Sequence, residues 1–221
     1  EGGVYGTTYH VSYRSDTDYD AEIRQEMERV NQSLSMFNKN SVISKWNRGE
    51  SDQVDSLFIA MYTKAKEVNQ VTGGAFDITV APLVNVWGFG FKNEKLPSAE
   101  KVDSLLRYVG MDKVQLDGDR VIKQVEGIQM DASSIAKGQG VDLVAEFFDR
   151  NGVHDYMIEI GGEVKVINNA LGISGLTNRL TTPRPPTGNC NSCWRCGKEP
   201  LQLPVITVVF TWWMEKNIRT R

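Results

Sequence analysis

Apolar residues recur at spacings of three and four in several parts of the chain, which is the period of an amphipathic helix. Four such stretches predict helices over residues 23–34, 54–68, 98–108 and 135–150. The pair Gly73-Gly74 follows the second stretch and supplies a usual helix stop. The pattern therefore predicts a domain that is rich in amphipathic helices.

Other segments are rich in β-branched and aromatic residues, which favour strands. We expect one strand over residues 4–13, a hairpin over 114–123 folded at Asp117-Gly118, and further strands over 128–131 and 156–160. Helices and strands are interspersed without an internal repeat. The first part of the chain is predicted to be an α/β or α+β domain.

Composition excludes several classes of protein. The chain has 221 residues, of which 40% are hydrophobic and 24% charged, which is too apolar for a disordered chain. The net charge of -3 does not favour a nucleic-acid partner, because such a protein should present a basic face. No run approaches the roughly 20 apolar residues that a membrane span requires. The chain opens on Glu-Gly-Gly, so we expect that any targeting segment has been removed.

Charge is distributed unevenly along the chain. Residues 1–167 carry 26 acids and 18 bases, which gives -8, whereas residues 168–221 carry 2 acids and 7 bases, which gives +5. The second segment also holds all 3 cysteines of the protein. Two different compositions therefore share one chain.

The segment 130–142, MDASSIAKGQGVD, is the strongest candidate for chemistry. A predicted strand ends here and a helix begins, so that Asp131 could cap the helix and Lys137 would add a cation near its positive end. Phosphate or pyrophosphate is stabilised at such a position. An ordinary capped helix with a surface lysine explains the same residues equally well. Gly138-Gln139-Gly140 is too short for a dinucleotide-binding fingerprint.

Two further segments are weaker candidates. In residues 71–91, a lone carboxylate, Asp77, precedes Trp87-Gly88-Phe89-Gly90, which would suit a flat conjugated ligand. A buried strand followed by a packed aromatic loop is the favoured alternative, because most aromatic clusters belong to a core. In EIGGE, residues 159–163, two carboxylates flank a predicted Gly-Gly turn, but nothing in the sequence shows that they converge.

Five motifs together resemble the ApbE family of flavin transferases. They are YGTTYHVSY, SLSMFNKNSVISKWNRGE, TGGAFDITVAPLVNVWGFG, DASSIAKGQGVD and IEIGGEV, in the order and spacing of that family. The resemblance implies a single α+β, T-fold-like domain with a mixed or antiparallel sheet and flanking helices. It also implies an Mg²⁺-dependent enzyme that moves FMN from FAD onto a Thr hydroxyl of a target protein and releases AMP.

The same resemblance implies roles for particular residues. Ala75, Phe76 and Asp77 would line the FAD site, Asp131 and Lys137 would hold the nucleotide, and Ser134 would supply one Mg²⁺ ligand. Tyr5 stands where the family has a flavin-contacting Met, and Phe37 stands where a Tyr is common. The targets would be respiratory flavoprotein subunits. The enzyme would lie on the periplasmic side of the inner membrane, held by a lipid on a Cys upstream of Glu1.

The later elements of the family pattern, including its His-containing segment, do not follow residue 166. If the codons for residues 201–220 are read in another frame, they permit a segment that resembles the missing one. We therefore expect an incomplete flavin transferase domain over 1–166 and an aberrant, out-of-frame tail over 167–221. On this hypothesis no catalytic residue is assigned, and the spacing of Cys190, Cys193 and Cys196 is not a zinc motif, since a fourth ligand is lacking.

Two alternatives to protein flavinylation remain open from the sequence. The chain could be an FAD-binding module or FAD pyrophosphatase that retains the cofactor site without modifying a protein. It could also be an unfolded truncation product, because the loss of the last strands of a sheet exposes edges and apolar faces.

Overall fold

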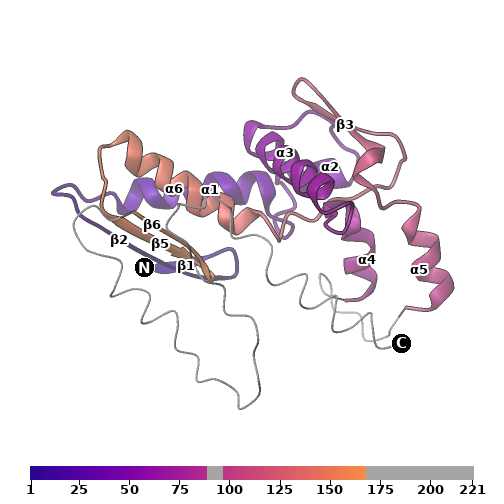
Figure 1. Cartoon of the computed structure of the whole chain (residues 1–221), viewed down its shortest axis with the longest axis horizontal. Helices are drawn as coiled ribbons and strands as arrows, with labels where there is room; N and C mark the ends of the chain where they lie inside the picture. Colours follow the sequence, from indigo (N-terminus) through magenta and orange to yellow (C-terminus); the bar gives the residue numbers. More distant parts are fainter. Residues whose placement is uncertain (89–96, 168–221) are drawn as a thin grey trace, which may run out of the picture.

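A computed structural model describes residues 1–88 and 97–167 and shows an antiparallel sheet with helices packed against it (Figure 1). The four strands of this sheet are β1 (Gly2–Val4), β2 (Thr7–Tyr13), β5 (Tyr156–Ile160) and β6 (Glu163–Ile167), and they lie in the order β1-β2-β5-β6. Every neighbouring pair is antiparallel. The predicted α+β class with flanking helices is confirmed.

Two long helices, α1 (Asp20–Leu34) and α6 (Ala136–Arg150), contact each other over this sheet (Figure 1). Residues alternate between the two sheet faces, as strand geometry requires. Tyr9, Ile158 and Ile160 therefore lie on the helix side, where they are buried with Val144 and Phe148 of α6. Burial of this apolar face holds the helix pair on the sheet.

A second hydrophobic cluster lies beside the first. Its buried residues come mainly from α2 (Val42–Asn47), α3 (Ser56–Val71), β3 (Val114–Asp117) and β4 (Arg120–Lys123). Two further described helices, α4 (Ala81–Val86) and α5 (Ala99–Leu106), contribute no residue to it. Trp46, Phe58 and Met130 are buried in this cluster. The indole of Trp46 also donates a hydrogen bond to the carbonyl of Val121 at 2.7 Å, which ties α2 to the hairpin.

The helices α1, α3, α5 and α6 and the hairpin β3–β4 appear where the sequence pattern predicted them. The short helices α2 and α4 were not predicted, and the second of these replaces the buried strand considered for residues 71–91. Among the described residues, no helix is both long and apolar enough to cross a membrane.

The prediction of one continuous strand over residues 4–13 is wrong. The chain turns back at Tyr5 and Gly6, whose φ angles are +52° and +75°, and β1 pairs with β2 as a hairpin. Two-residue hairpin turns favour positive φ, which glycine adopts without strain. Tyr5 is the one non-glycine residue with a positive φ in the described part of the chain.

The prediction of a strand over residues 128–131 is also wrong. The backbone there is not part of a sheet. Its hydrogen bonds go elsewhere: the amide of Met130 donates to the side chain of Asn47, and the amide of Asp131 donates to the carbonyl of Ile78. A strand-like sequence is therefore held by individual partners in place of a neighbouring strand.

Candidate functional site

A cavity of about 180 Å³ lies between the C-terminal end of α1, the β1–β2 turn and the start of α6. Its lining is Tyr5, Val30, Asn31, Leu34, Ser35, Met36, Phe37, Ser133, Ala136 and Lys137. Three residues predicted to bind the cofactor, Tyr5, Phe37 and Lys137, therefore meet at one place although they are far apart in the sequence. The cavity combines aromatic rings, apolar side chains and one ammonium group.

Tyr5 forms a fixed wall of this cavity. Its hydroxyl donates a hydrogen bond of 2.7 Å to the carbonyl of Met27 in α1. Burial of the ring raises the pKa of the Tyr5 hydroxyl well above its usual range, so the group stays neutral and remains a donor. A Met side chain at this position, which lacks a hydroxyl, could not make that bond.

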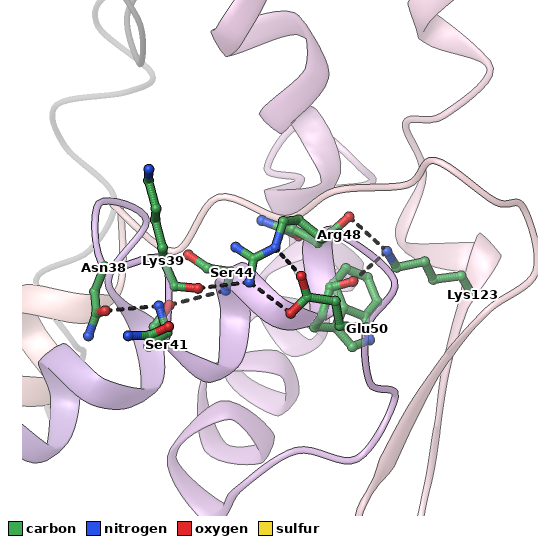
Figure 2. Close-up of polar contacts among 10 residues, drawn as sticks. Asn38, Lys39, Ser41, Ser44, Arg48, Glu50 and Lys123 are labelled. Atoms are coloured by element: carbon green, nitrogen blue, oxygen red, sulfur yellow. Dashed lines mark hydrogen bonds and ion pairs between the residues drawn. The ribbon is translucent and has the colours of Figure 1, made fainter.

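Phe37 lies at the mouth of the cavity, and its side chain is 75% exposed. The loop that carries it is held from two sides. Ser41 and Ser44 donate to the carbonyl of Ser35 at 2.7 and 3.3 Å. Arg48 donates to the carbonyl of Lys39 at 2.8 Å (Figure 2). A large apolar ring is thus kept in solvent by a well-bonded loop, which suits a group that meets a ligand.

Lys137 projects from the first turn of α6 toward the β5–β6 turn. Its ammonium donates to the carbonyl of Gly161 at 3.0 Å and lies 3.5 Å from a carboxylate oxygen of Glu163. The positive charge therefore stands beside the cavity, at the end of the helix where the dipole is also positive. The sequence predicted a cation near the start of this helix, and its role in holding a phosphate group stays a prediction.

Asp131 does not cap α6, which corrects the sequence prediction. The N-cap residue is Ile135, which has no side-chain cap bond, because a turn at residues 133–135 precedes the helix. A carboxylate oxygen of Asp131 accepts from the amide of Ser133 at 2.8 Å. The side chain is half-buried and stabilises the turn that brings Ser133 to the cavity.

The segment Ala75, Phe76 and Asp77 lies next to Asp131, because the amide of Asp131 donates to the carbonyl of Ile78 at 2.7 Å. One oxygen of Asp77 accepts from the amide of Thr79 at 2.8 Å, and the other accepts from the amide of Met111 at 3.0 Å. The structure therefore gives Asp77 a local role as a helix cap. None of these four residues lines the 180 Å³ cavity.

Ser134, the predicted metal ligand, is half-buried in the turn before α6 and does not line the cavity. Within residues 1–88 and 97–167, no three His, Cys, Asp or Glu side chains form a group that could hold a metal ion. Mg²⁺ prefers near-octahedral oxygen ligation. The described side chains do not fit that requirement by themselves. Cys190, Cys193 and Cys196 lie outside the described residues.

The two carboxylates of the segment 159–163 do not converge. They lie on opposite faces of the sheet, because Glu159 pairs in register with His10 and Glu163 with Ile160. A hydrogen bond from His10 at 2.8 Å lowers the pKa of Glu159. Glu163 instead lies on the side of Lys137. The pair is therefore not an acid/base couple.

Several residues of the site were not predicted from the sequence. Ser133, Asn31 and Met36 line the cavity, and Asn47 holds the backbone of Met130. Ser133 stands inside the motif that was singled out and could have been chosen beside Ser134. The others are placed by contacts between distant segments. A second, more open depression of about 470 Å³ lies between α4, α5 and Gly127, and it contains none of the predicted residues.

Comparison with known proteins gives a consistent result. The model of the ApbE family matches residues 5–181. The chain is 32% identical over 195 residues to an FAD:protein FMN transferase of Vibrio cholerae and 35% identical over 203 residues to one of Haemophilus influenzae. These matches cover 83% and 84% of this chain, and 58% of each relative.

Solved structures agree with the sequence relatives. The flavin transferase ApbE from Vibrio cholerae superposes with a TM-score of 0.73 at 33% identity, over 79% of this chain and 59% of that one. The flavinyl transferase ApbE of Pseudomonas stutzeri gives 0.70 at 32% identity, over 75% of this chain and 56% of that one. The chain thus spans about three-fifths of the relatives that it matches.

The family model and the solved structures agree on the family of this chain. The chain belongs to the ApbE family. The family match continues to residue 181, past the predicted domain boundary at residue 166. Residues 168–221 lie outside the described part, so the division of the chain at that point stays a prediction.

Proposed function

We propose that this chain is part of an enzyme that transfers FMN from FAD to a Thr hydroxyl of a target protein and releases AMP. The observation that carries the proposal is the meeting of Tyr5, Phe37 and Lys137 at one cavity. The two rings suit a flat flavin, and the ammonium at a helix N-terminus suits a phosphate. The names of the relatives, FAD:protein FMN transferase, supply the substrate class.

The reaction is a displacement at phosphorus. The Thr oxygen forms a bond to the phosphorus of the FMN half, the bond from that phosphorus to the bridging oxygen breaks, and AMP leaves with the electron pair. The Thr proton is lost to a base, for which we assign no residue of the described part. Lys137 would offset charge on the pyrophosphate, since a fixed cation lowers the cost of charge that develops in the transition state.

Mg²⁺ is the metal that the family resemblance supplies to this reaction, where it would neutralise the pyrophosphate. Ser134 would contribute one oxygen ligand. The described side chains do not complete such a site, so no metal-dependent step of the reaction is assigned to them. The test includes Mg²⁺ for this reason.

The experiment is to incubate the chain with FAD, Mg²⁺ and an acceptor protein that carries a reactive Thr. The expected result is an acceptor band with in-gel flavin fluorescence that survives denaturation, together with one AMP per labelled acceptor. An acceptor with that Thr replaced by Val is the control. FAD bound without any labelled acceptor would overturn the transferase proposal.

A second function, FAD binding or FAD hydrolysis without protein modification, uses the same cavity. It predicts AMP together with free FMN in solution, or FAD that is retained unchanged. The same assay distinguishes the two, because covalent label appears only with transfer. A thermal melt followed by circular dichroism tests whether the chain folds, and a cooperative transition would contradict an unfolded product.

The acceptor and the location of the enzyme follow only from the family resemblance. We propose acceptors among respiratory flavoprotein subunits, and a lipid anchor upstream of Glu1 that holds the enzyme on the periplasmic side of the inner membrane. Fractionation of cells that produce the full gene product would test this location. Recovery of the protein in the soluble cytoplasmic fraction would contradict it.

A further inference from the structure

Asn47, the last residue of α2, makes a pair of hydrogen bonds to one distant backbone unit. Its side-chain nitrogen donates to the carbonyl of Met130 at 2.9 Å, and its side-chain oxygen accepts from the amide of Met130 at 2.8 Å. The side-chain amide of Asn47 therefore supplies to Met130 the donor and the acceptor that a neighbouring strand would supply. Without it, both backbone groups of a fully buried residue would lack their partner.

The residue that follows Met130 is Asp131. Its own amide is bonded to the carbonyl of Ile78 at 2.7 Å, so successive peptide units of this segment are held by different elements. Asp131 then supports the turn that carries Ser133 to the cavity. A displacement of Met130 would therefore pass directly into the wall of the candidate site.

Asn47 is itself firmly placed. The ammonium of Lys123 donates to the carbonyls of Trp46 and Asn47 at 2.7 and 3.3 Å and closes the C-terminal end of α2 (Figure 2). The side-chain nitrogen of Asn47 also lies 3.9 Å from the sulfur of Met36, another cavity residue. One amide therefore touches both the Asp131 segment and the loop that carries Phe37.

We propose that Asn47 is a positioning residue of the cofactor site. Its side-chain amide holds residues 130–131 and the loop that carries Met36 and Phe37 in the positions that FAD binding requires. This inference rests on the proposed function. It predicts that loss of the Asn47 side-chain amide lowers FAD affinity beyond what its effect on folding stability explains, because a small displacement of binding groups has a large effect on binding.

The test compares Asn47→Leu, which has similar size but no polar atoms, with Asn47→Asp, which keeps the acceptor for the amide of Met130. The control is Tyr62→Phe, which removes a buried side-chain bond of 2.7 Å to the carbonyl of Val114, away from the cavity. For each full-length chain we would measure the Kd for FAD, the thermal midpoint and the hydrogen exchange of the amides of residues 130 and 131.

We expect Asn47→Leu to raise the Kd for FAD about tenfold or more, and to accelerate exchange at Met130. Asn47→Asp should retain slow exchange at Met130 and lose less affinity, and Tyr62→Phe should lower the midpoint but leave the Kd unchanged. Fast exchange at Met130 in Asn47→Leu with an unchanged Kd would overturn the inference. So would an equal loss of affinity in Tyr62→Phe.

The two proposals can fail separately. If the unaltered chain does not bind FAD, the proposed function is overturned, and with it the cofactor role of Asn47. The exchange measurement needs no FAD and still decides whether Asn47 orders residues 130 and 131. If Asn47→Leu does not fold, Asn47→Asp is compared with Tyr62→Phe. Asn47→Asp loses the donor to the carbonyl of Met130 and should still raise the Kd for FAD, so a Kd equal to that of Tyr62→Phe would overturn the inference.

Discussion

The hydroxyl of Tyr5 lies 3.0 Å from the position that a Cβ atom on Gly140 would occupy, and a ring carbon of Tyr5 lies 3.1 Å from it. The ring cannot retreat freely, because its hydroxyl is bonded to Met27 and its backbone φ is +52°. Gly140 therefore permits α6 and the β1–β2 turn to approach closely. This contact sets one wall of the cavity.

We expect Gly140→Ala to lower the free energy of unfolding by about 1 kcal/mol, because overpacking costs about 1–3 kcal/mol and the gain in helix propensity returns about 1. The displaced ring should also weaken FAD binding. Urea denaturation and FAD titration measure the two effects.

A double-mutant cycle with Tyr5→Phe is the control for this prediction. Removal of the hydroxyl relieves the closest contact, so Gly140→Ala should cost less in the Tyr5→Phe background. Additive costs would show that the two residues do not compete for space.

The sequence predicted best those elements whose pattern is local. The period of apolar residues in α1, α3 and α6 survives in the structure, since each helix buries one face. The strand predicted over 4–13 failed at Tyr5, which has a positive φ and donates to the carbonyl of Met27 in α1, a tertiary contact that the local pattern does not show. The strand predicted over 128–131 failed because Asn47, 83 residues away from Met130, supplies the partner.

The candidate site shows the same division. Tyr5, Phe37 and Lys137 were chosen from motifs and do share a cavity. The helix cap assigned to Asp131 was wrong, because the turn at residues 133–135 could not be read from the apolar pattern. Asn47 lies within the motif at residues 33–50, but nothing in that motif marks its side chain as a partner of Met130. Its importance comes from contacts between distant segments, which no local pattern encodes.

Lys137 is expected to contribute to FAD affinity through its charge. Lys137→Met should raise the Kd for FAD about tenfold, which corresponds to about 1.4 kcal/mol, and should weaken the dependence of binding on salt, because a screened interaction has been removed. Lys165→Met is the matched control, since Lys165 also bridges β6 to α6, through Asp142 at 2.9 Å, but does not line the cavity. Equal losses in the two variants would contradict a specific role.

Asp55 links two helices at one carboxylate oxygen. That oxygen accepts from the amide of Phe58 at 2.8 Å, which caps α3, and from the hydroxyl of the buried Ser33 of α1 at 2.7 Å. Asp55→Ala should cost about 2 kcal/mol of unfolding free energy, of which about half is the cap and half the unsatisfied hydroxyl. Denaturant unfolding measures the change.

The cap of α5 provides the comparison for Asp55. Ser98 accepts from the amide of Lys101 at 3.3 Å, in a helix that has no buried residue. Ser98→Ala should therefore cost less than about 1 kcal/mol. If the two substitutions cost the same, the bond from Ser33 contributes nothing to the link between α1 and α3.

Lys123 should make the stability of the protein depend on pH in the alkaline range. Burial beside Trp46 lowers the pKa of its ammonium to about 8, from an ordinary value of 10.5. Between these two values the unfolded chain binds more protons at this site than the folded chain, so the free energy of unfolding contributed by Lys123 rises with pH. The neutral amine still has hydrogens to donate to the carbonyls of α2. We therefore expect the stability difference between the unaltered chain and Lys123→Gln to grow between pH 7.5 and pH 9.5 in urea unfolding, and a difference that is constant or falls would contradict the lowered pKa.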